Sequence, residues 1–163
     1  MDDVFGVLGQ YKPEKIQDGF GIIKGTFACR FNSFRIEAYD GDFQDLVGTE
    51  VVRYELEIIT EGDNLGRRLW KRFYLGSQKP DGKGKLDIQK LADVLFTLGF
   101  EFKTRDELMA VLEKAAELVV EVKAWGWTPK DKESGLDKEP VQQHIIKGVA
   151  TDKQVADSKN VPF

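Results

Sequence analysis

One segment alternates apolar and polar residues so regularly that it restricts the chain to a fold with a half-buried sheet. Within the segment from Thr49 to Thr60, apolar side chains occupy every second position from Val52 to Ile58. One face carries Val52, Tyr54, Leu56 and Ile58, and the other carries Arg53, Glu55 and Glu57. Side chains alternate between the two faces of a strand, so this pattern buries one face and leaves the other in solvent. Segment 49–60 is therefore predicted to be a strand of an antiparallel sheet.

Four further segments have the composition of strands, at residues 25–39, 67–75, 118–127 and 141–150. The segment 25–39 is rich in aromatic and β-branched residues, but no single alternation fits its whole length. We therefore expect a β-bulge within it. Short turns around Gly41 and Gly62 separate the first three strands, which predicts an antiparallel meander.

The chain between the third and fourth expected strands has the pattern of two helices. The first begins at Asp87 and ends before Gly99, a residue suited to the position after the last helical turn. Thr104 and Glu107 have the spacing of a capping box at the start of the second helix. Three strands, a helical segment and two more strands follow one another in an OB-fold. We predict a mainly β protein, a five-stranded OB-fold barrel with a helical insertion between strands 3 and 4.

From its length and composition, we expect the chain to have three parts, of which the barrel is the middle one. The 163 residues suffice for one domain with extensions, namely an N-terminal arm (1–24), the OB-fold domain (25–150) and a flexible C-terminal tail (151–163). The one cysteine, Cys29, excludes a disulfide within the chain, and with one histidine an ordinary zinc site is not expected. No metal or other cofactor is expected. The sequence has no apolar run that could cross a bilayer and no secretory signal pattern, so we expect a cytoplasmic protein.

Motifs of catalysis are missing from the sequence. It contains no Gly-x-Ser-x-Gly elbow, no Gly-x-x-x-x-Gly-Lys-Ser/Thr phosphate loop and no dinucleotide-binding fingerprint after a strand. No histidine pairs with a serine or cysteine in a recognisable nucleophile motif. We therefore expect a binding protein and not an enzyme.

Charge is unevenly distributed, although the net charge of −4 is small. Residues 67–90 contain eight Lys or Arg and two acidic residues, whereas residues 37–63 contain nine acidic residues and one Arg. A strongly basic segment beside an acidic one indicates a local anion-binding site. Two solvated faces would give the same distribution, so charge alone leaves both interpretations open.

The third expected strand combines basic and aromatic side chains on one face. That face carries Arg68, Trp70, Arg72 and Tyr74, and the interior face carries Leu69, Phe73 and Leu75, with Lys71 near the rim or at a bulge. Such a face suits single-stranded nucleic acid, because bases stack on rings while phosphates contact Arg or Lys. The alternative is that Trp70 and Tyr74 pack under the N-terminal arm and the arginines pair with Glu55 and Glu57.

Neighbouring strands supply further candidate contacts. Arg53 is on the outward face of the second expected strand, beside the third, and we expect it to contact phosphates together with Arg68, Lys71 and Arg72. Trp125 and Trp127 share a face of the fourth expected strand. We expect one of these tryptophans to assist base stacking and the other to pack on the barrel.

With these residues, the chain resembles a family of small phage and prophage single-stranded DNA-binding proteins over roughly residues 24–150. The shared features are Gly25-Thr26-Phe27, Glu61-Gly62-x-x-x-Gly66-Arg67 before an aromatic third strand, Leu91-Ala92-x-x-Leu95-x-x-x-Gly99 and Val120-x-Val122. The resemblance implies an OB-fold that coats single-stranded DNA during phage replication or recombination, in the cytoplasm of a bacterial host.

The C-terminal residues resemble the tail tip of bacterial single-stranded DNA-binding proteins. Val161, Pro162 and Phe163 match the aliphatic residue, proline and terminal phenylalanine of that tip. The resemblance implies that replication or repair proteins dock on these three residues. The acidic run that precedes the tip in that family is thin here, because lysines offset the two aspartates of the tail.

The sequence thus leads to one main hypothesis and two alternatives. The main hypothesis is a protein that binds single-stranded DNA with little sequence specificity, as a monomer or a homo-oligomer. The first alternative is a protein-interaction module, anti-host or scaffold, whose aromatic third strand is an interface. The second is an oligosaccharide-binding OB domain, which would use the aromatic rings but would not need the surrounding basic residues.

Overall fold

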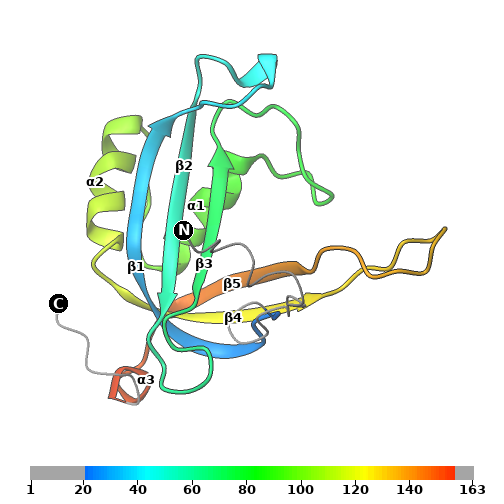
Figure 1. Cartoon of the computed structure of the whole chain (residues 1–163). Helices are drawn as coiled ribbons and strands as arrows, with labels where there is room; N and C mark the ends of the chain where they lie inside the picture. Colours follow the sequence, from blue (N-terminus) through cyan, green and yellow to red (C-terminus); the bar gives the residue numbers. More distant parts are fainter. Residues whose placement is uncertain (1–20, 157–163) are drawn as a thin grey trace, which may run out of the picture.

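The computed structural model describes residues 21–156 and is built on one antiparallel sheet of five strands. These are β1 (Gly25–Ala38), β2 (Glu50–Ile58), β3 (Arg68–Tyr74), β4 (Val119–Trp127) and β5 (Val141–Val149). Their order across the sheet is β3-β2-β1-β4-β5. The long strand β1 pairs with β2 along its second half and with β4 along its first half, so the sheet curls around β1 into a half-barrel (Figure 1). The mainly β, antiparallel prediction is confirmed.

A β-bulge in β1 determines which of its side chains face outward. The register with β2 shifts between Phe31 and Ser33, as the broken alternation of this segment predicted. The extra residue brings Phe31 and Phe34 to the same inner face, where both are buried and their ring centroids lie 4.9 Å apart. After the bulge, the outward positions are Ser33, Arg35 and Glu37.

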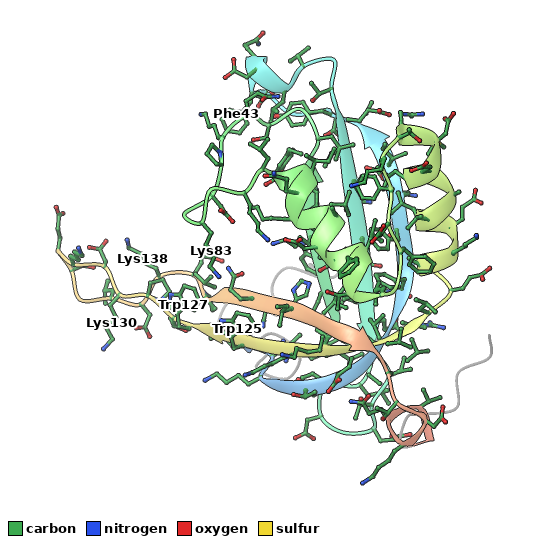
Figure 2. The ribbon with its side chains drawn as sticks, turned by 180° about the vertical axis from the view of Figure 1, so that it is seen from behind. Phe43, Lys83, Trp125, Trp127, Lys130 and Lys138 are labelled. Atoms are coloured by element: carbon green, nitrogen blue, oxygen red, sulfur yellow. The ribbon has the colours of Figure 1, made fainter. Side chains whose placement is uncertain are left out.

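Two helices cover the concave side of the sheet, opposite its outward face. Helix α1 (Asp87–Thr97) lies behind β2 and β3 in Figure 1 and in front of the sheet in Figure 2, and α2 (Arg105–Ala115) lies beside β1 in both views. Their leucines, including Leu91 and Leu112, complete the core against the inner faces of the strands. Gly99 adopts a φ of 93° after α1, and the Thr104 hydroxyl accepts a hydrogen bond from the Glu107 amide at 3.1 Å. Both helix boundaries therefore follow the local signals in the sequence.

The two ends of the described chain pack on the half-barrel. Ile23 is buried, and its backbone N–H and C=O exchange hydrogen bonds with the Gln142 side chain at 2.7 and 2.9 Å. The segment after β5, expected to lack regular structure, begins instead with the short helix α3 (Asp152–Ala156). The Thr151 hydroxyl accepts from the Gln154 amide at 3.2 Å, and the Gln154 side chain accepts from the Thr151 amide at 2.7 Å. This reciprocal capping is the signal that the sequence interpretation overlooked.

The inside of the half-barrel contains a polar contact between β2 and β5. The Tyr54 Oη and His144 Nε2 atoms are 2.6 Å apart and hydrogen bonded. Tyr54 is buried, so this bond satisfies a hydroxyl that water cannot reach. Burial, and secondarily the charge of Lys71, lower the pKa of His144 from 6.5 to about 4. No helix within residues 21–156 has the length and apolar character needed to cross a membrane.

The lowered pKa of His144 predicts a loss of stability in acid. The unfolded chain takes up a proton as the pH falls through about 6.5, whereas the folded chain takes it up only near pH 4. The contribution of neutral His144 to the free energy of unfolding is therefore fully present above about pH 6.5. It decreases as the pH falls through this window, by a total on the order of 3 kcal/mol. Urea denaturation across this pH range measures the decrease. A His144→Gln variant, which keeps a partner for Tyr54, should lose this part of the pH dependence, and an unchanged profile in the variant would contradict the assignment.

Candidate functional site

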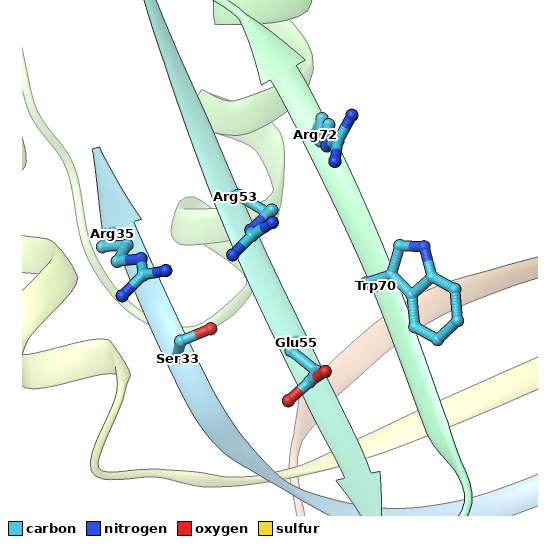
Figure 3. A pocket seen from close by; sticks show the side chains of 6 residues that line it. All are labelled: Ser33, Arg35, Arg53, Glu55, Trp70 and Arg72. Carbon is cyan, nitrogen blue, oxygen red and sulfur yellow. The ribbon is translucent and has the colours of Figure 1, made fainter. Parts of the chain in front are cut away.

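The outward face of β1, β2 and β3 carries a shallow hollow of about 420 Å³ (Figure 3). Its lining residues come from all three strands and are Ser33, Arg35, Arg53, Glu55, Trp70 and Arg72. Strand register explains why they meet. Arg35 is opposite Arg53, which is opposite Arg72, and in the next row Ser33, Glu55 and Trp70 are opposite one another. We call this depression the Trp70 hollow.

Trp70 presents an aromatic ring that the fold does not use for packing. Its side chain is 64% exposed, whereas Leu69 and Phe73 on the opposite face of β3 are buried in the core. The ring stands at the side of the hollow in Figure 3. An indole held on a rigid strand with its face in solvent is available for stacking against a planar group.

Arg35, Arg53 and Arg72 form a row across the three strands, which we call the arginine row. Like charges directly opposite one another in a sheet are destabilising. Within residues 21–156, one carboxylate forms salt bridges with the row: Glu37 contacts Arg35 at 2.5 Å and Arg53 at 3.6 Å. Within residues 21–156, no salt bridge involves Arg72. The row therefore keeps an excess of positive charge, which an anion would neutralise.

Arg68 differs from the arginine row because acidic residues already hold it. Its guanidinium is 3.7 Å from a Glu55 carboxylate oxygen and 3.8 Å from a Glu57 oxygen. Glu57 also accepts a hydrogen bond from Arg30 at 3.0 Å. For Arg68, the structure thus matches the alternative in which an arginine pairs with Glu55 and Glu57, and for Arg53 and Arg72 it does not.

Three other predicted contact residues lie away from the Trp70 hollow. Lys71 is on the inner face of β3, where its Nζ atom is 5.7 Å from the centroid of the Phe73 ring. Trp125 and Trp127 are on the outward face of β4, 41% and 49% exposed, at the base of the β4–β5 hairpin (Figure 2). Neither tryptophan lines the hollow, and neither is among the buried core residues.

Tyr74 continues the outward face of β3 beyond Arg72. Its ring meets that of Tyr39 edge to face, with 5.9 Å between centroids. Val161, Pro162 and Phe163 lie outside the described residues, so the structure does not bear on their docking role. Cys29 is completely buried, and burial raises the pKa of its thiol to about 12, which makes it an inert core residue.

Arg35 is the site residue that the sequence interpretation missed. Its outward position depends on the bulge, because an unbroken alternation through Phe31 would assign different residues to the outer face of the strand. The alternation of Ser33, Arg35 and Glu37 counted from the end of the strand was the available signal. Comparison of the chain with protein-family models, curated proteins and solved structures gives no match. The function of this face therefore has to be inferred from its residues.

Proposed function

We propose that this protein is a non-catalytic OB-fold protein that binds single-stranded DNA with little sequence preference. The observation that carries the proposal is the juxtaposition of the exposed Trp70 ring and the under-neutralised arginine row on one face. The sheet order β3-β2-β1-β4-β5, with α1 and α2 after β3, supports an OB-type barrel. In such barrels, the face of the second and third strands is the binding surface.

The chemistry of this face fits a single strand better than a duplex. A base can stack on Trp70 while its phosphates contact the arginine row, and stacking tolerates every base because each has a π face. In a duplex the bases are stacked and paired, so their faces are not accessible to the indole. Glu55 and Glu57 flank the row and would repel a backbone that strays from it. The phage and prophage resemblance extends the proposal to DNA replication or recombination in a bacterial cytoplasm.

An anisotropy titration with labelled oligonucleotides tests this function. We expect oligo-dT to bind more tightly than a duplex of the same length, with quenching of tryptophan fluorescence by the bound strand. The same titration with oligo-U compares DNA with RNA. If neither single strand binds at low salt and the tryptophan fluorescence does not change, the proposed function is wrong.

A second candidate function is a protein-interaction module, favoured by the outward face of β4 and β5. Trp125, Trp127 and Ile145 are exposed apolar residues on this face. Contiguous exposed apolar residues are one mark of a protein–protein interaction site. Binding through this face should depend little on salt, in contrast with phosphate contacts, whose affinity falls steeply as salt rises.

Removing the carboxylate that shields the arginine row should strengthen DNA binding. Glu37 pairs with Arg35 and Arg53, and a phosphate has to compete with it for both guanidinium groups. We expect Glu37→Gln to raise the affinity for oligo-dT by roughly 1.5- to 5-fold, the range set by a surface ion pair of about 0.2–1 kcal/mol. Anisotropy titration measures the change.

The control for Glu37→Gln is Glu113→Gln, which changes the net charge equally on the exposed surface of α2. We expect the control to bind like the wild type. Equal gains in both variants would mean that overall charge, and not release of the arginine row, governs the affinity.

A further inference from the structure

We propose that a second hollow beside the Trp70 hollow receives the next base of a bound single strand and prefers a base with an exocyclic amino group. The proposal rests on the DNA-binding function proposed above and deepens it. The second hollow has a volume of about 320 Å³ and lies between the end of β1, the loop that follows it and β3. The aromatic residues Tyr39, Phe43 and Tyr74 are among those that line it.

The two hollows share two arginines. Arg53 and Arg72 line both of them, with Trp70 on one side and Tyr74 on the other. Trp70 and Tyr74 are four residues apart on the same face of β3, a separation of about 13 Å along the strand. A phosphate on Arg53 and Arg72 would therefore have a base-binding ring on each side of it.

Phe43 supplies a second exposed ring for stacking. It is 75% exposed, the highest exposure of any large apolar side chain in the described part of the chain. Its backbone N–H donates a hydrogen bond to the Tyr39 hydroxyl at 3.1 Å, which ties the loop to the Tyr39–Tyr74 ring pair. Figure 2 places Phe43 in this loop, at the end of the sheet. Nothing in residues 21–156 covers this ring, so among the described residues its surface is open to a ligand.

The spacing of the hollows favours unstacked bases. Successive bases of a helical strand lie about 3.4 Å apart along the axis. Two neighbouring bases that occupy both hollows have to separate to roughly four times that distance, with their shared phosphate at Arg53 and Arg72. A single strand can extend in this way, whereas a duplex would have to break its stacking and pairing.

Carboxylates at the second hollow distinguish between bases. Three carboxylates, those of Glu37, Asp40 and Asp42, line this hollow. Glu37 pairs with Arg35 and Arg53, whereas neither aspartate takes part in a salt bridge within residues 21–156. Carboxylate oxygens accept hydrogen bonds from the amino groups of cytosine and adenine, and thymine has no such group. We therefore expect the second hollow to prefer cytosine over thymine, while the shared arginines hold the phosphate.

The experiment compares oligo-dC and oligo-dT of equal length by anisotropy, in the wild type and in an Asp40→Asn/Asp42→Asn double variant. We expect the wild type to bind oligo-dC about fivefold more tightly. The double variant should lower this dC-to-dT affinity ratio at least about threefold. The matched control is Glu113→Gln/Glu117→Gln, which removes two charges from the α2 region and should leave the ratio unchanged.

A second variant tests the ring independently of the acids. We expect Phe43→Ala to weaken binding of both oligonucleotides about fivefold, and Phe96→Ala, which removes a 66% exposed ring from α1, to have no effect. One outcome would overturn the second base site and leave the proposed function standing. In it, the wild type binds oligonucleotides and Trp70→Ala weakens this binding, but the dC-to-dT affinity ratio of the double aspartate variant and the affinity of Phe43→Ala equal those of the wild type. If no oligonucleotide binds the wild type, the proposed function itself is overturned, and this inference with it.

Discussion

Replacing Trp70 by alanine is expected to weaken binding of single-stranded DNA by about 5- to 150-fold, the effect of losing one base–aromatic stack of about 1–3 kcal/mol. The free energy of unfolding should change little, because the indole is 64% exposed and the core contacts of β3 come from its other face. Anisotropy titration with oligo-dT measures the affinity, and urea denaturation measures the stability.

Two further variants make the Trp70 result specific. Trp70→Phe keeps a ring at the same position and should retain most of the affinity. Trp125→Ala removes an exposed tryptophan outside the hollow and should have a smaller effect than Trp70→Ala. If Trp70→Ala binds like the wild type, or unfolds the protein, the indole is not a stacking surface.

Replacing the arginine row by glutamine is expected to reduce the affinity about 100-fold at 0.1 M salt. Each phosphate contact to a single strand contributes about −0.7 to the slope of log K against log salt, so losing three contacts should flatten the slope by about two units. Glutamine preserves most of the length of the side chain, and its neutrality removes the repulsion between facing guanidinium groups. Stability should therefore be maintained or slightly raised. Titrations at a series of salt concentrations give the slope.

The control for the arginine row is Arg68→Gln on the same face of β3. Because Glu55 and Glu57 already pair with Arg68, its loss should change the salt slope much less than the loss of Arg72. Equal slope changes for Arg68→Gln and Arg72→Gln would show that phosphates do not distinguish Arg68 from Arg72, which has no salt bridge within residues 21–156.

Secondary structure was predictable here because its determinants are local. The alternation from Val52 to Ile58 predicted β2, and the broken alternation of segment 25–39 predicted a bulge in β1. Thr104 with Glu107 predicted the start of α2. Each of these features depends on residues within a few positions of one another. The capping of α3 by Thr151 was equally local and was overlooked.

The aromatic and basic residues that β3 contributes to the candidate site were also predictable from local alternation. Trp70 and Arg72 are two residues apart on one strand, so they share a face in any sheet. Arg35 was harder to assign, because local alternation gives its face only if it is counted from the end of the strand, after the bulge. Burial of both Phe31 and Phe34 in the core decides that position, and this requires the rest of the core to be in place.

The amino-acid sequence by itself determined which residues of each strand share a face, because that property repeats every two residues along the chain. Only the tertiary structure decided which residues face one another across strands. The pairing register put Arg35, Arg53 and Arg72 in one row and brought Glu55 and Glu57 to Arg68. The curl of the sheet left Trp125 and Trp127 outside the hollow. Register and curl follow from packing the whole core, and an ion pair between strands depends on distances that no local pattern encodes.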